Sequence, residues 1–284
     1  MIISASRRTD IPAFYSKWLM NRLKEGYVMV PNPYNNKISR VDLSLGEVDC
    51  IVFWTKNPLP MIDLLPELIN MGYKFYFLFS LLPYGKDVEE NLPSKNELVN
   101  TFIDLSQMIG KEKVIWRYDP ILISDVYTIN WHLEQFEDMC KKLSGYTNRC
   151  IISFIDVYSH IKKNFREMNT NEADFLAKNF SKIAKKFNIL LYTCAEKMDL
   201  DKYGISHSSC IDKNIIEEAI GKKISVKKNP AQRKYCECLS SVDIGVYNTC
   251  VYGCKYCYAT SKKVIALNNY KNHDPKSSVL TGTS

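Results

Sequence analysis

The sequence lacks any long apolar run, and nowhere in its 284 residues do eighteen or more apolar residues follow one another. A helix that spans a membrane requires such a run, so we expect no membrane partner. The opening residues MIISASRRTDIP also lack the apolar core of a secretory signal peptide, and we expect a cytoplasmic protein. Hydrophobic residues make up 46% and charged residues 24% of the chain, which excludes a disordered or collagen-like polypeptide.

Histidine is also scarce, because the chain has four, and none forms a His-x3-His or a His–Cys pair. We therefore expect no histidine ligand at a metal site. Cysteine, in contrast, occurs ten times. Because the cytosol keeps thiols reduced, we expect metal or cluster ligands among them rather than a disulfide framework. Cys50, Cys140 and Cys150 lie in apolar segments, and we assign these three to the core.

Positive charge is concentrated toward the C-terminus. Residues 211–284 contain 12 Lys and Arg against 6 Asp and Glu, so they carry +6 of the net charge of +7. A basic segment of this kind attracts anionic partners, nucleic acid among them. A solvated lysine surface is the simpler interpretation of the charge alone.

Short apolar segments alternate with amphipathic segments through residue 193. The apolar segments are rich in Val, Ile, Phe and Tyr, which is typical of strands buried on both faces of a parallel sheet. They predict strands at Met1–Ala5, Cys50–Trp54, Lys74–Phe79, Lys113–Trp116, Cys150–Ile155 and Ile189–Thr193. Helices are predicted between them, around residues 18–23, 98–109, 134–143 and 172–187. This alternation indicates a parallel (β/α) barrel or a doubly wound sheet.

Polar residues follow the predicted strands directly, and for this reason we favour the barrel. Ligands of parallel α/β folds bind where the carboxyl ends of the strands meet. The sequence therefore predicts a site for a polar or anionic small molecule at this edge, although a helix cap or a surface ion pair explains any one residue alone. The candidate binding residues are Ser6, Arg8, Lys56, Arg117, Asp119 and Glu196.

The sharpest local signal is the segment Cys250-Val-Tyr-Gly-Cys254-Lys-Tyr-Cys257. Zinc sites usually use two separated pairs of ligands, whereas three cysteines in eight residues form one compact loop. Three thiolates in such a loop fit a [4Fe–4S] cluster with one iron left open. We therefore predict that Cys250, Cys254 and Cys257 bind a [4Fe–4S] cluster.

This Cys-x3-Cys-x-aromatic-Cys pattern, with Tyr256 as the aromatic residue, resembles the hallmark of the radical SAM superfamily. In typical members the cysteine loop follows the first barrel strand, but only 27 residues follow Cys257 here. The resemblance therefore implies a partial or open barrel whose first βα unit is circularly permuted to the C-terminus. We expect a strand at 242–247, parallel to the first strand, and a helix at about 260–268. Residues 1–235 would form the barrel body and residues 236–284 would complete the same barrel.

The whole chain also resembles an uncharacterised bacterial family, a domain of unknown function with the cysteine loop at its C-terminus. The segments that carry this likeness are SRRTDIPAFY, FWTKNP, RYDPI, Cys194-Ala195-Glu196 and Cys210-Ile211-Asp212. FWTKNP and RYDPI are also distantly similar to strand ends of enzymes like spore photoproduct lyase.

The radical SAM resemblance implies reductive cleavage of S-adenosylmethionine, with an electron donor such as a flavodoxin or ferredoxin. Arg117 is the expected partner of the cofactor carboxylate, because a guanidinium offers two parallel donors. Asp119 and Glu196 are expected at its amino or ribose hydroxyl groups. The usual Gly-Gly-Glu element is absent, and residues 6–10 (SRRTD) stand in its place. The substrate is not predictable from the sequence.

Four more cysteines are candidates for a second centre, either zinc or another iron–sulfur cluster: Cys194, Cys210, Cys236 and Cys238. They are equally explained as buried thiols. Two other functions also stay open. One is a metal-binding protein that binds nucleic acid through its basic C-terminal region, where Tyr247, Tyr252, Tyr256, Tyr258 and Tyr270 would stack on bases. The other is a barrel hydrolase or lyase with a structural metal.

Overall fold

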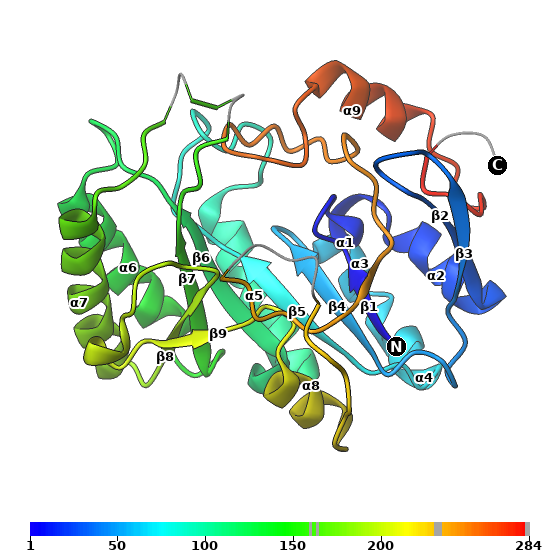
Figure 1. Ribbon diagram of the computed structural model, residues 1–284, viewed down its shortest axis with the longest axis horizontal. Helices are drawn as coiled ribbons and strands as arrows, with labels where there is room; N and C mark the ends of the chain where they lie inside the picture. The colour runs from blue at the N-terminus through cyan, green and yellow to red at the C-terminus, as the bar shows by residue number, and fades with distance from the viewer. Residues whose placement is uncertain (159–160, 163–164, 230–234, 282–284) are drawn as a thin grey trace.

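The computed structural model describes residues 1–158, 161–162, 165–229 and 235–281. Eight parallel strands form the main sheet, and two antiparallel strands form a separate hairpin (Figure 1). In chain order the strands are β1 (Ile2–Ala5), β2 (Tyr27–Pro31), β3 (Ile38–Asp42), β4 (Cys50–Thr55), β5 (Phe75–Ser80), β6 (Val114–Ile121), β7 (Arg149–Phe154), β8 (Leu190–Cys194), β9 (Ser206–Ser208) and β10 (Val242–Asp243). The order in the main sheet is β10-β1-β4-β5-β6-β7-β8-β9.

The helices begin at positions that the local sequence marks. Ser94 and Glu97 form a capping box at the start of α5, and Asn169 and Glu172 form another at α7. The helices are α1 (Ile11–Phe14), α2 (Ser16–Glu25), α3 (Leu59–Ile62), α4 (Leu65–Asn70), α5 (Lys95–Ile109), α6 (Ile129–Leu143), α7 (Thr170–Lys186), α8 (Lys213–Ile220) and α9 (Lys263–Lys271), with 3-10 turns at Lys111–Lys113 and Asp201–Tyr203. No helix in the described ranges is long and apolar enough to cross a membrane.

The two faces of the sheet have different coverings. On the outer face, residues such as Phe53, Phe77 and Trp116 pack with the helices in the larger apolar cluster. Because side chains alternate along a strand, the residues between them point to the inner face. There, Val52 and Leu78 pack with α8 and with the segments that carry four of the cysteines. Helix α8 itself lies under the end where β4 and β5 begin (Figure 1).

The predicted α/β class with a parallel sheet is confirmed, and so is the position of the C-terminal strand. Strand β10 pairs in parallel with β1, with Ile3 opposite Val242 and Ser4 opposite Asp243. The regular strand covers two residues rather than the predicted 242–247, and the helix after it begins three residues later than expected. Strands β9 and β10 lie at opposite edges and do not pair with each other in the described ranges, so the sheet is open there.

Candidate functional site at the carboxyl edge of the sheet

The inner face of the sheet changes from apolar to polar where the strands end. On β5, Ser80 follows Leu78, and on β6, Arg117 follows Ile115, each two residues further along the strand. Ser80 and Arg117 are also register partners on these neighbouring strands. The carboxyl edge therefore presents polar side chains above an apolar interior, as the sequence predicted.

Arg117 has a central place at this edge. Its Nη1 donates to Ser80 Oγ at 3.4 Å, and its Nη2 pairs with the Asp119 carboxylate. The Cζ atoms of Arg117 and Arg7 lie 4.9 and 5.2 Å from the centre of the Trp54 ring, so two cations contact one indole. The buried Nε of Arg117 has no hydrogen-bond partner in the described part of the chain. Arg117 therefore has a buried donor, Nε, that the described residues leave unused.

Glu196, the candidate after β8, lies near the same group. Its carboxylate accepts hydrogen bonds from Ser153 Oγ at 2.8 Å and from the backbone N–H of Phe154 at 2.9 Å. Burial, aided by the negative charge of Asp119, raises the pKa of Glu196 to about 7. This carboxyl group can therefore hold or release a proton near neutral pH.

Two of the predicted cofactor residues instead hold β10 against β1. Ser6 Oγ donates to the Asp243 carboxylate at 2.7 Å, and the Arg8 guanidinium donates to the Gly245 carbonyl at 3.3 Å. A Cβ atom at Gly245 would lie 2.0 Å from Ser6 Oγ, so only glycine allows this close approach. The polar residues after β1 thus hold β10 in place.

The loop Cys250–Cys257 docks on residues 88–91, which follow β5. Backbone hydrogen bonds of 2.9 and 3.0 Å join the two segments, and Cys254 lies opposite Glu89 in an isolated antiparallel bridge. Gly253 has a φ of +70°, and a Cβ there would lie 3.1 Å from the Glu90 carboxylate. The glycine between the first two cysteines is therefore required by the turn.

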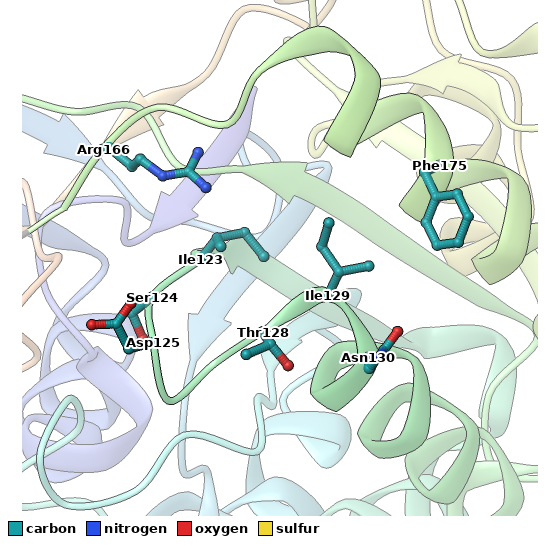
Figure 2. Close-up of a pocket in the computed structure, with 8 residues that line it drawn as sticks. All are labelled: Ile123, Ser124, Asp125, Thr128, Ile129, Asn130, Arg166 and Phe175. Carbon is teal, nitrogen blue, oxygen red and sulfur yellow. The ribbon is translucent and has the colours of Figure 1, made fainter.

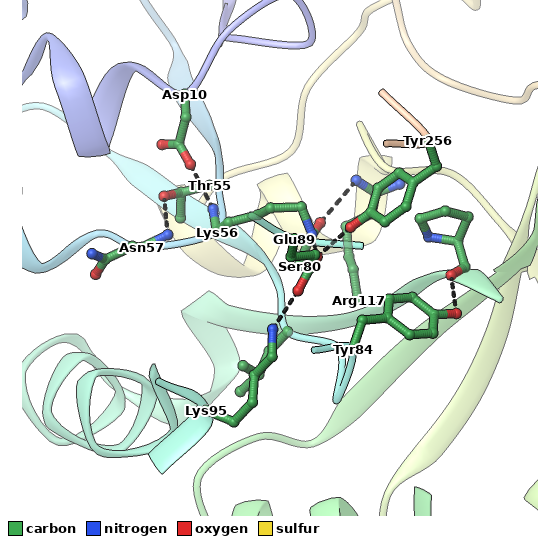
Figure 3. A network of polar contacts seen from close by, with 12 residues as sticks. Asp10, Thr55, Lys56, Asn57, Ser80, Tyr84, Glu89, Lys95, Arg117 and Tyr256 are labelled. Atoms are coloured by element: carbon green, nitrogen blue, oxygen red, sulfur yellow. Dashed lines mark hydrogen bonds and ion pairs between the residues drawn. The ribbon is translucent and has the colours of Figure 1, made fainter. Parts of the chain in front are cut away.

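A buried carboxylate, Glu89, fixes this loop to the body of the protein (Figure 3). It is 1% exposed, and it accepts from the Lys56 ammonium at 2.8 Å, from Lys95 and from the Tyr256 hydroxyl. Burial by itself raises the pKa of Glu89, but the two lysines outweigh burial and the pKa is lowered overall. The Glu89 cluster (Glu89, Lys56, Lys95 and Tyr256) therefore contains a charged carboxylate.

The thiols of Cys250, Cys254 and Cys257, here called the rim cysteines, lie close to one another. Burial is the main cause that raises the pKa of Cys250, and the charges of the other two raise it further. Burial also raises the pKa of Cys254 to about 12, although the positive charge of Lys56 acts in the opposite direction. Three thiol donors on one loop have the chemistry that an iron–sulfur cluster requires. As the described residues stand, however, no three or more His, Cys, Asp or Glu side chains are spaced to hold a metal ion.

Tyr258 connects the rim cysteines with the arginines. Its hydroxyl donates to the Arg7 carbonyl at 2.6 Å. Tyr258 is 48% exposed, and its electrostatic interactions include both Cys257 and Arg117, so this side chain lies near both. The structure therefore brings the rim cysteines and Arg117 to the same edge of the sheet.

The other four candidate cysteines gather inside the sheet, below Arg7 and Arg117. The Sγ atoms of Cys194 and Cys210 are 3.2 Å apart, and Cys238 interacts electrostatically with both. Hydrogen bonds from the other thiols strongly lower the pKa of Cys238. All of them are buried, and we call them the inner cysteine cluster: Cys194, Cys210, Cys236 and Cys238. The remaining three, Cys50, Cys140 and Cys150, are buried in the core as predicted.

A surface hollow lies elsewhere and contains none of the predicted site residues (Figure 2). Its volume is about 740 Å³, and it lies between the β6–α6 loop and α7. Arg166, the basic side chain there, is already held by Glu172 through bonds of 2.8 and 2.7 Å. We therefore place the candidate site at the carboxyl edge rather than in this hollow.

The sequence prediction missed three residues of the site: Trp54, Glu89 and Lys95. For the nucleic-acid alternative, the structure places two of the five tyrosines in the interior. Tyr252 is buried with its ring 4.5 Å from that of Phe14, and Tyr256 is buried against the Glu89 cluster. These two rings are thus not available to stack on bases.

Comparison with known proteins identifies a family but no reaction. The sequence model of a family described as a domain of unknown function, DUF1848, matches residues 2–259. No curated protein matches the chain. A candidate alpha-L-fucosidase of known structure, from Bacteroides thetaiotaomicron VPI-5482, is 10% identical, with 87% of this chain and 95% of that chain covered. Its TM-score is 0.28, so this likeness carries no argument about fold or activity.

Proposed function

The chain belongs to the DUF1848 family, and we propose that it is an iron–sulfur enzyme that cleaves S-adenosylmethionine reductively. The proposal rests chiefly on one observation: three partly buried cysteines stand on the loop after β10, at the same edge as Arg117. When bound there, a [4Fe–4S] cluster with an open iron supplies the electron that splits the sulfonium and starts radical chemistry. The substrate of that chemistry stays open.

The chain's own residues have separate tasks in this proposal. The rim cysteines hold the cluster, and the Glu89 cluster keeps their loop in place. Arg117 binds the cofactor carboxylate through its unpartnered Nε, since charged hydrogen bonds of this kind orient a carboxylate. Glu196 holds a proton at its buried carboxyl near the amino or ribose groups. Electrons come from a partner such as a flavodoxin or ferredoxin.

The test is anaerobic reconstitution of the full chain with iron and sulfide. We expect a brown protein with thiolate-to-iron absorbance, and an EPR signal of the reduced protein that changes when S-adenosylmethionine is added. Under reducing conditions, 5′-deoxyadenosine and methionine should accumulate. An EPR signal unaffected by S-adenosylmethionine would contradict the proposed activity.

Two variants make the assignment specific. The triple variant C250A/C254A/C257A should lose the cluster, the colour and the cleavage products. The matched control is Cys140→Ala, which removes a buried cysteine on α6, away from the edge, and should keep all three. If the triple variant keeps its iron and colour, the rim cysteines are not the ligands.

A further inference from the structure

The inner cysteine cluster is not used by the proposed function, and it does not resemble ordinary core packing. Its members come from the end of β8, from the residues after β9 and from the segment that leads to β10. These strands lie toward opposite edges of the sheet, yet the thiols meet inside it. Cys194 and Cys210 lie with their sulfurs 3.2 Å apart, and the Ile211 N–H, next to Cys210, donates to Cys238 Sγ at 3.4 Å. Thiols that serve only as small apolar groups have no need to face one another.

We propose that the inner cysteine cluster binds a single zinc ion with all four thiolates, independently of the rim cysteines. Zinc in structural sites is bound by four ligands in a closed tetrahedron, and a set of four cysteines is among its common forms. Such a site would join the segment before β10, which carries Cys236 and Cys238, to the β8–β9 edge of the sheet, where the described strands leave the sheet open.

The separation of the Cys194 and Cys210 sulfurs favours one zinc ion over an iron–sulfur cluster. With Zn–S bonds of about 2.3 Å, neighbouring sulfurs of a tetrahedron are about 3.8 Å apart. Cys194 and Cys210 are 3.2 Å apart, so a spread of roughly half an ångström would admit the ion. As they stand, no three or more His, Cys, Asp or Glu side chains in the described ranges are spaced to hold a metal. A [4Fe–4S] cluster binds each thiolate to a different iron, and would require a much larger separation.

The surroundings suit the charge of such a site, because one zinc ion with four thiolates has a net charge of −2. The Arg7 side chain is within hydrogen-bond range of Cys238, and Arg117 is close to Cys194 and Cys210. The backbone N–H of Ile211 also donates to Cys238 Sγ, at 3.4 Å. Two guanidinium groups thus lie close to the negative site, and N–H donors of this kind stabilise metal-bound thiolates.

Metal analysis of the full chain tests this inference. We expect one zinc per chain, with four sulfur neighbours at about 2.3 Å in X-ray absorption spectra. The same zinc should remain in the triple variant C250A/C254A/C257A, which separates this site from the rim cysteines. Chains without zinc, or with iron or a disulfide at these cysteines, would overturn the proposal whatever the outcome at the rim.

Single variants identify the ligands. Cys238→Ser should lose the zinc, whereas Cys140→Ser, which changes a buried cysteine on α6, should keep one equivalent. Because Cys238→Ser also weakens the fold if zinc is structural, cobalt exchange into the unaltered chain gives a second measurement. Four thiolates around cobalt give intense charge-transfer bands and the visible bands of a tetrahedral site. Absence of these bands would overturn the tetrathiolate assignment.

Discussion

Replacement of Glu89 by Gln should destabilise the protein strongly, although it changes one oxygen to an amide. Glu89 is 1% exposed and pairs with Lys56 and Lys95, whose side chains are 16% and 27% exposed. The variant leaves two largely buried ammonium groups without their anion, and removal of one partner of a buried ion pair costs about 3–5 kcal/mol. With a urea m-value of about 3 kcal/mol per M, the unfolding midpoint should fall by about 1 M or more.

The neighbouring residue provides the matched control. Glu90 is exposed and pairs with Lys263 at the surface, so Glu90→Gln should change the free energy of unfolding little. Both variants are compared by urea unfolding followed by circular dichroism, with the iron content of reconstituted protein measured alongside. Glu89→Gln should also retain less iron, because Glu89 anchors the cysteine loop through Tyr256 and the bridge to Cys254. Equal stability of the two variants would refute the assigned role of the buried carboxylate.

Three further predictions follow from single side chains. His132 is fully buried, and burial lowers its pKa to about 4. Below about pH 6.5 the unfolded chain therefore binds a proton at this residue, whereas the folded chain binds it only near pH 4. The free energy of unfolding should therefore decrease by about 3 kcal/mol between pH 7 and pH 4 through this group, and urea titrations of His132→Gln should lack that component. Arg117→Ala should weaken S-adenosylmethionine binding by about 1–3 kcal/mol in calorimetry of the reconstituted protein, with iron content unchanged; unaltered affinity would exclude Arg117 from the cofactor site. Gly245→Ala should cost about 1–3 kcal/mol in thermal unfolding, because its Cβ would overlap Ser6, and a neutral effect would contradict the tight contact between β1 and β10.

The sequence predicted those parts of the fold that depend on local pattern. Continuous apolar runs located the central strands, because strands buried on both faces need apolar residues at every position. The edge strand β10 was placed by a different argument, the need of a permuted unit to recover its neighbour, and its pairing with β1 confirms the placement. The hairpin β2–β3 was not predicted, since β2 is only partly buried and β3 is mostly exposed, so neither resembles a strand buried on both faces.

The site could be predicted only in part, because several of its contacts join distant parts of the chain. Glu89 and Glu90 are adjacent acids in a polar segment, and no local signal distinguishes the buried one from the exposed one. Their difference arises when the loop around Cys254 docks on this segment more than 160 residues later. Ser6 was expected at the cofactor for its position after β1, but its partner Asp243 is likewise far away in the chain.

Arg117 connects the two proposed centres, and its geometry restricts how it serves both. One nitrogen, Nη2, is engaged by Asp119 and another, Nη1, by Ser80, which leaves Nε as the buried donor without a partner in the described ranges. Cys194 and Cys210 of the inner cysteine cluster lie near the guanidinium, and Trp54 contacts its face. These contacts hold the group in one orientation, so the Arg117 side chain would lose little further conformational entropy on binding a carboxylate. A lysine at this position would keep the charge but neither the planar fork nor the stacking, and would not replace the arginine.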